Sequence, residues 1–176
     1  MLETGFPYSA DASARVLILG SMPGRKSLDE QQYYAHPRNA FWPIMANLFG
    51  FDLSLPYPAR LEQLHHQEIA LWDVAHQCKR AGSLDADIQQ HTVIANDFNL
   101  FFRSHPHIQW IAFNGQKAAE LYRRMVRPAL APPFADIPCL YLPSTSPAHA
   151  SMRLEEKQVQ WQRIRTLLQS APHDQD

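Results

Sequence analysis

The chain has 176 residues, of which 45% are hydrophobic, and a formal net charge of −1 at pH 7. It has no apolar run of the roughly 18 residues that cross a membrane and no leader pattern at its start, so we expect a soluble, cytoplasmic protein. We also expect it to be a monomer. The near-neutral charge argues against a protein that coats nucleic acid, and the widely separated Cys78 and Cys139 argue against a metal site or a disulfide, so no cofactor is expected.

Four short apolar segments alternate with helical patterns along the chain. This alternation predicts an α/β fold, a three-layer sandwich with a central four-stranded parallel sheet flanked by helices. The expected strands are 15–20, 69–74, 108–113 and 139–142. The expected helices are 39–49, 59–65, 97–104, 116–125 and 153–169.

Local signals refine these elements. Asn96 is the predicted N-cap of the third helix, and the proline-rich segment 127–133 is predicted to be a loop. The length predicts one domain over 1–169, followed by a polar tail over 170–176. The last helix carries one apolar stripe for packing, formed by Leu154, Trp161, Ile164, Leu167 and Leu168.

The candidate site lies where the four strands end, because the carboxyl ends of parallel strands meet at one edge of the sheet. The residues there are Gly20, Ser21, Met22, Pro23 and Gly24 after the first strand, Asp73 after the second, Asn114 after the third, and Ser144, Thr145, Ser146, Pro147 and His149 after the fourth. Together these segments are suited to hold a nucleic-acid base and its flanking phosphates.

Each of these features also has a plainer interpretation. The hydroxyls and N–H groups of the 144–149 loop suit a phosphate, with Pro147 stiffening the loop, but they equally suit an ordinary Ser/Pro turn. Tyr34 is placed to stack on a base or to pack in the core. Asn114 reads a base edge or occupies a left-handed turn before Gly115, and Asp73 contacts the base or caps a neighbouring loop.

Four motifs resemble the uracil-DNA glycosylase superfamily, most closely its hypoxanthine-DNA glycosylase branch. They are Gly-Ser-Met-Pro-Gly at 20–24, Tyr-Tyr-Ala-His-Pro-Arg-Asn-Ala-Phe-Trp at 33–42, Phe-Asn-Gly at 113–115 and Leu-Pro-Ser-Thr-Ser-Pro-Ala at 142–148. The resemblance implies the fold of that superfamily and a monofunctional glycosylase of base excision repair. Its substrate is then a flipped, deaminated base, most simply hypoxanthine, in double-stranded or single-stranded DNA.

Three other functions stay open from the sequence. The first is a uracil-specific or G:U/G:T mismatch-specific glycosylase, which shares the motifs. The second is a module that binds a nucleotide or single-stranded nucleic acid without catalysis, which needs the aromatic platform and the phosphate loop alone. The third is a hydrolase of free nucleosides, which needs no contact with a duplex.

The resemblance also assigns roles to residues. Mismatch-specific relatives place a catalytic amide at the position of Met22, where a thioether cannot orient water. In the branch that this chain resembles, that role falls on Asn39, which is also suited to cap the following helix. The base-binding residues are then Tyr34, Asn114, Met22 and Asp73, with His36 and Arg38 in support and His149 as a wedge in the duplex or a donor to the leaving base.

Overall fold

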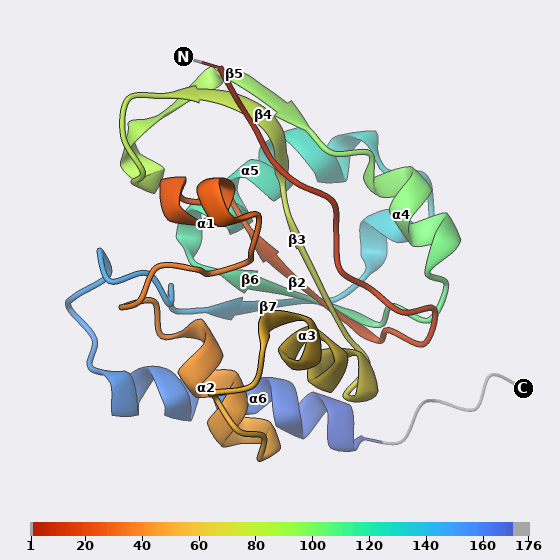
Figure 1. Ribbon diagram of the computed structural model, residues 1–176. Coiled ribbons are helices and arrows are strands. Elements are labelled where there is room, and N and C mark those ends of the chain that lie inside the picture. Colours follow the sequence, from red (N-terminus) through yellow and green to blue (C-terminus); the bar gives the residue numbers. More distant parts are fainter. Residues whose placement is uncertain (1, 171–176) are drawn as a thin grey trace, which may run out of the picture.

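A four-stranded parallel sheet forms the centre of the protein (Figure 1). The computed structural model describes residues 2–170, and every structural statement below concerns that part of the chain. The strand order is β3–β2–β6–β7, and the strands are β2 (Val16–Gly20), β3 (Ile69–Asp73), β6 (Trp110–Asn114) and β7 (Cys139–Leu142). The predicted fold class is confirmed, and the observed strand bounds differ from the predicted ones by at most two residues.

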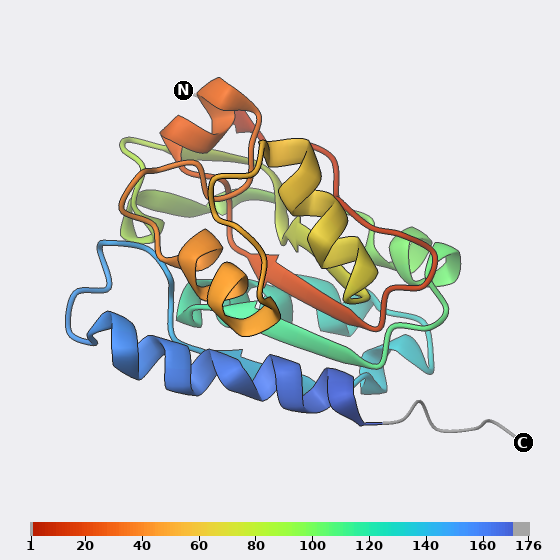
Figure 2. The same cartoon turned by 60° about the horizontal axis from the view of Figure 1, so that its bottom comes forward.

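Alternate side chains of the sheet build two separate apolar cores. Leu17 and Leu19 point to one face and pack with α4 (Phe98–Ser104) and α5 (Gln116–Leu121). Val16 and Ile18 point to the other face, which the remaining large helices cover. Those helices are α2 (Phe41–Phe49), α3 (Tyr57–His66) and α6 (Leu154–Gln169), with α2 and α6 side by side in both views (Figures 1 and 2). The period of two in a strand therefore produces the three layers.

A second sheet was not predicted from the sequence. It is antiparallel, has the order β1–β4–β5, and consists of β1 (Leu2–Thr4), β4 (Ala75–Arg80) and β5 (Ile88–Ala95). β4 follows β3 after the single residue Val74, and the connection from β4 to β5 contains a 3-10 turn, η1 (Asp85–Asp87). A short helix, α1 (Arg25–Glu30), was also missed. This sheet matters for the site because its connection carries Asp85 to the edge of the central sheet.

Two predicted details are wrong. The N-cap of α4 is Asp97, whose side chain accepts a hydrogen bond from the Leu100 N–H at 3.0 Å, while Asn96 donates its side-chain amide to the Asp73 carbonyl at 2.8 Å. On α6, Leu154 is exposed and the charged Lys157 is buried. The buried face of α6 thus begins at Lys157, about one turn after Leu154, where the predicted apolar stripe starts.

The remaining elements agree with the sequence in outline. α5 continues into one turn of π-helix, η2 (Tyr122–Val126). The expected loop over 127–133 begins with a short 3-10 turn, η3 (Arg127–Ala129), and a second one, η4 (Phe134–Asp136), follows it directly. Of the predicted tail, residues 171–176 lie outside the described residues. Within residues 2–170 every helix is too short or too polar to cross a bilayer.

Candidate functional site

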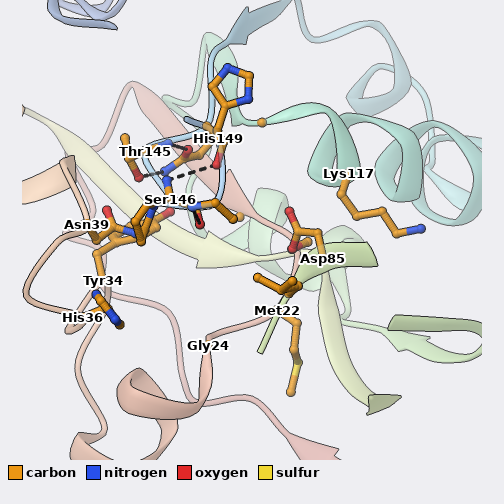
Figure 3. A pocket seen from close by; sticks show the side chains of 18 of the residues that line it. Met22, Gly24, Tyr34, His36, Asn39, Asp85, Lys117, Thr145, Ser146 and His149 are labelled. Carbon is orange, nitrogen blue, oxygen red and sulfur yellow. Dashed lines mark hydrogen bonds between the residues drawn. The ribbon is translucent and has the colours of Figure 1, made fainter. Parts of the chain in front are cut away.

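A cleft of about 1060 Å³ lies at the carboxyl edge of the parallel sheet. Every residue that the sequence analysis proposed for a site lines it: Gly20, Ser21, Met22, Pro23, Gly24, Tyr34, His36, Arg38, Asn39, Asp73, Asn114, Ser144, Thr145, Ser146, Pro147 and His149. In Figure 3, Tyr34, His36 and Asn39 lie on one side of the cleft, and Met22 and Asp85 lie on the other. The site is therefore assembled from segments that are more than 100 residues apart in the sequence.

Asn39 lies two residues before the start of α2, with its side chain half-buried at the cleft. Its Oδ1 accepts a hydrogen bond from the Phe41 N–H at 2.9 Å. This bond fixes the amide orientation, because a backbone N–H can only donate. An amide oxygen has two lone pairs, so Oδ1 can also accept a hydrogen bond from a water in the cleft. The N-cap position of α2 is Ala40, so Asn39 is not the N-cap that the sequence predicts, but it bonds the N–H of the first helical residue from one position earlier. Support of the first turn of α2 and orientation of water are thus compatible roles for one side chain.

Asn114 and Thr145 form a reciprocal pair of buried hydrogen bonds. The Thr145 N–H donates to Asn114 Oδ1 at 2.9 Å, and Asn114 Nδ2 donates to Thr145 Oγ1 at 3.0 Å. The Thr145 carbonyl then accepts the Ala40 N–H at 3.0 Å. The end of β6, the 144–149 loop and the start of α2 are therefore tied together beside Asn39. The left-handed interpretation of Asn114 is wrong, because the positive φ of +97° belongs to Gly115.

The loop after β7 is held by hydrogen bonds from α6 and by hydrogen bonds within the loop itself. The Pro143 carbonyl accepts the indole N–H of Trp161 at 2.9 Å, and the Ser146 carbonyl accepts Lys157 Nζ at 3.3 Å. The Ser144 and Ser146 hydroxyls accept N–H bonds from Ser146 and Ala148. A hydroxyl that accepts such a bond keeps its own O–H for an anion. The loop is thus a fixed turn with donors available for a phosphate.

The floor of the cleft is formed by Gly20, Tyr34 and Asp73. A Cβ at residue 20 would overlap Asp73 Oδ1 and lie 3.3 Å from Tyr34 Oη, so glycine leaves the room that both groups need. The Tyr34 ring packs on Phe41 with centroids 4.1 Å apart, and Tyr34 has a φ of +57°, which is uncommon outside glycine. Within residues 2–170, neither Tyr34 Oη nor Asp73 Oδ2 has a hydrogen-bond partner.

Burial changes the ionisation of both floor residues. Removal from water, with a smaller contribution from the negative charge of Asp85, raises the pKa of Asp73 to about 7, against the opposing effect of Arg80. Burial, followed by the charge of Asp73, raises the pKa of Tyr34 well above its ordinary value. Near neutral pH, Asp73 is thus present in both its protonated and its ionised form.

Asp73 is expected to weaken the fold as the pH rises. Its pKa is near 3.8 when unfolded and about 7 when folded, so between these values the folded chain holds a proton that the unfolded chain releases. Protonated Asp73 therefore adds to the free energy of unfolding at pH 4, and this contribution is lost by about pH 7. It is on the order of 4 kcal/mol at most. We predict that urea titrations show Asp73→Asn gaining stability over the wild type across this range. A difference that stays constant with pH contradicts the prediction.

The Gly20–Gly24 segment is held by polar contacts from the second sheet. The buried Arg80 donates to the Pro23 carbonyl at 2.6 Å and pairs with Glu3 of β1. The Ser21 hydroxyl donates to Asp85 Oδ1. Met22 is buried and belongs to the apolar core as well as to the lining of the cleft. The second sheet therefore positions the first motif.

The rim of the cleft carries the exposed His36 and Arg38 and the half-buried His149. His36 Nδ1 accepts the Arg38 N–H at 3.1 Å, which orders the turn that leads to Asn39. Arg38 makes no ion pair within residues 2–170. The His149 N–H donates to the Ser146 carbonyl at 3.0 Å, so this residue closes the loop.

Sequence reasoning missed four charged residues that line the cleft: Asp85, Lys117, Glu120 and Arg163. Lys117 follows the Asn114-Gly115 turn closely, so its place in the cleft lining could have been predicted from the sequence. Asp85 and Arg163 lie at the second sheet's turn and on α6, so only the tertiary fold places them here.

Comparison with known proteins gives consistent relationships. The family model for the uracil DNA glycosylase superfamily matches residues 6–167. A protein named hypoxanthine DNA glycosylase from Methanosarcina barkeri is 40% identical over 121 residues, 68% of this chain and 75% of that protein. One of the same name from Methanosarcina acetivorans is 38% identical over 128 residues, 72% of this chain and 79% of its own.

A solved structure is similar over nearly the whole chain. It is the solution NMR structure of a Methanosarcina acetivorans protein described as a candidate uracil DNA glycosylase. It superimposes with a TM-score of 0.79 at 32% identity, covering 97% of this chain and 100% of that one. The likeness therefore includes the fold and the segments that build the cleft.

Proposed function

The chain belongs to the uracil-DNA glycosylase superfamily, and from that premise we propose that it is a DNA glycosylase that releases a deaminated base, hypoxanthine foremost. One observation carries the proposal: a single cleft holds an amide that can orient water, a loop suited to phosphate and a floor of unpartnered polar atoms. The name shared by the two curated relatives supports hypoxanthine over uracil. The enzyme class is thus a hydrolase of N-glycosyl bonds.

The reaction breaks the bond between the base nitrogen and C1′ of the sugar. The electron pair leaves with the base, and the sugar develops oxocarbenium character. Water adds its oxygen to C1′, and the proton that it loses balances the charge of the departing base. Asn39 Oδ1 orients this water as an acceptor. Because a neutral amide is a poor base, most of the acceleration comes from stabilising the leaving anion and the cationic sugar.

The substrate has to leave the stack to reach this cleft. Asn39 lies on the wall of a concave site, so we propose that the nucleotide is flipped out of the duplex before hydrolysis. The base then stacks on Tyr34, the 144–149 loop holds the adjacent phosphates, and His149 fills the gap in the stack. The protein acts on DNA as a monomer, with Met22 forming an apolar part of the wall.

The experiment uses end-labelled duplexes that carry one hypoxanthine, uracil or xanthine, together with an undamaged duplex of the same sequence. After incubation with excess enzyme, alkali converts abasic sites into strand breaks. We expect breaks at hypoxanthine, fewer at uracil and xanthine, and none in the undamaged duplex.

The other outcomes separate the alternatives. Breaks mainly at uracil move the substrate assignment to the uracil-specific class. Binding that weakens with salt but leaves every strand intact indicates a nucleic-acid-binding module. Release of the base from free inosine, but not from DNA, indicates a nucleoside hydrolase.

A further inference from the structure

The floor of the cleft contains buried polar atoms whose hydrogen-bonding capacity is unused. Asp73 is 5% exposed, and neither its Oδ2 nor Tyr34 Oη finds a partner within the described part of the chain. Buried polar groups in proteins are nearly always paired, and an unpaired one in a cleft indicates a missing partner. Asp73 Oδ1 and Tyr34 Oη are the atoms that lie against the position where Gly20 has no side chain, and both residues line the cleft. The carboxyl group therefore lies where a molecule that enters the cleft can supply the missing partner.

We propose that Asp73 acts in its protonated form, as donor and acceptor to the paired N–H and C=O of a lactam base. The proposal rests on the glycosylase function proposed above and names how that site recognises its base. Hypoxanthine carries such an N–H beside a C=O, and uracil carries an equivalent pair. A neutral carboxyl group has a C=O that accepts and an O–H that donates, side by side. The two edges therefore match in pairs.

Ionised Asp73 does not match this edge. A carboxylate offers only acceptors, so one of its oxygens faces the carbonyl oxygen of the base. The mismatch grows during the reaction, because the electron pair of the broken bond spreads onto the base and its carbonyl oxygen. The neutral O–H strengthens its hydrogen bond to that oxygen as the charge develops, and the proton stays on Asp73. The protonated form thus favours both binding and departure of the base.

The surroundings of Asp73 keep the neutral form available. Asp85 of η1 and the buried Arg80 of β4 are the charged groups that act on it, with opposite signs. The other titratable groups that its charge reaches are Tyr33 and Tyr34, before α2, and Tyr57 on α3. Burial and Asp85 together exceed the effect of Arg80, so the pKa of Asp73 is about 7. Protonation of Asp73 is thus accessible at neutral pH.

The test is the pH profile of the single-turnover rate on a hypoxanthine duplex, measured from pH 6 to pH 9 with saturating enzyme. The wild-type rate is expected to fall about 10-fold or more as Asp73 ionises. Asp73→Asn keeps a donor and an acceptor but cannot ionise, so its rates at pH 6 and pH 9 are expected to agree within about threefold. Asp85→Asn removes a neighbouring negative charge, so the wild-type decline is expected to move to lower pH.

Asp87→Asn is the matched control, since it removes the same charge from η1 outside the cleft lining, and it is expected to keep the wild-type profile. A wild-type rate that is flat or rises with pH overturns the inference, as does a decline that persists in Asp73→Asn. If Asp73→Asn does not fold, the wild type and Asp85→Asn decide the matter by the direction of the shift. Absence of cleavage by the wild type at every pH contradicts the proposed function instead.

Discussion

Asn39→Ala is expected to slow excision of hypoxanthine by about 100-fold or more under single-turnover conditions. The side chain stands at the cleft wall, and its Oδ1 is held by the Phe41 N–H at 2.9 Å, so it is pre-positioned for a water. Removing it leaves that water without an oriented acceptor while the base and phosphate contacts remain. The rate of the chemical step therefore falls, whereas binding of the duplex changes little.

Asn39→Ser is the matched control for the second role of Asn39. A serine hydroxyl can cap the first turn of a helix, so the loss of about 1 kcal/mol of stability expected for alanine is largely avoided. The shorter side chain does not reach the water, and excision is expected to stay slow. Thermal unfolding and single-turnover rates of both variants separate the two roles. Rates within twofold of the wild type in both variants remove Asn39 from the mechanism.

Asn114→Ala is expected to lower the free energy of unfolding by about 2–4 kcal/mol and to reduce excision as well. The substitution leaves the Thr145 N–H and hydroxyl without a hydrogen-bond partner, although both are buried and bonded to Asn114 in the native protein. Thr145 also holds the Ala40 N–H, so a loosened loop displaces the start of α2 and with it Asn39. Urea titration and single-turnover rates measure the two effects.

Thr145→Val is the graded comparison. It keeps the shape and the backbone N–H of residue 145 and removes only the hydroxyl. The free energy of unfolding is therefore expected to fall by about 1 kcal/mol. The double variant should lose less than the sum of the single losses, because the two side chains are bonded to each other. Strict additivity would show that the pair does not act as a unit and that Asn114 acts elsewhere.

The fold was largely predictable because its central strands are short apolar runs that end in turns. All four, including 139–142, were located to within two residues. β4 was missed because Ala75-His76-Gln77-Cys78-Lys79-Arg80 contains no β-branched or aromatic residue. Its conformation depends on pairing with β1, which is remote in the sequence, and with β5, which follows after an irregular connection that contains η1. Only tertiary structure determines such a strand.

The site was predictable in its residues and less so in their contacts. Topology brings strand ends together, so Asp73 and Asn114 were correctly expected to line one cleft, whereas Asn39 was expected there from the motif resemblance alone. The side-chain amide of Asn114 makes two hydrogen bonds with Thr145. These bonds depend on a loop conformation that residue types do not determine. The raised pKa of Asp73 comes first from burial and then from the charge of Asp85, and both depend on the tertiary fold, including the connection of the unpredicted second sheet.

The most direct test of the account is to detect the released base. A duplex with one hypoxanthine is incubated with the wild type or with Asn39→Ala, and free bases are measured by mass spectrometry without any strand-cleaving step. The account predicts free hypoxanthine, one equivalent per duplex, with the wild type, and at most a few per cent of that rate with Asn39→Ala. Equal release by both proteins, or an intact duplex with the folded wild type bound to it, contradicts the account.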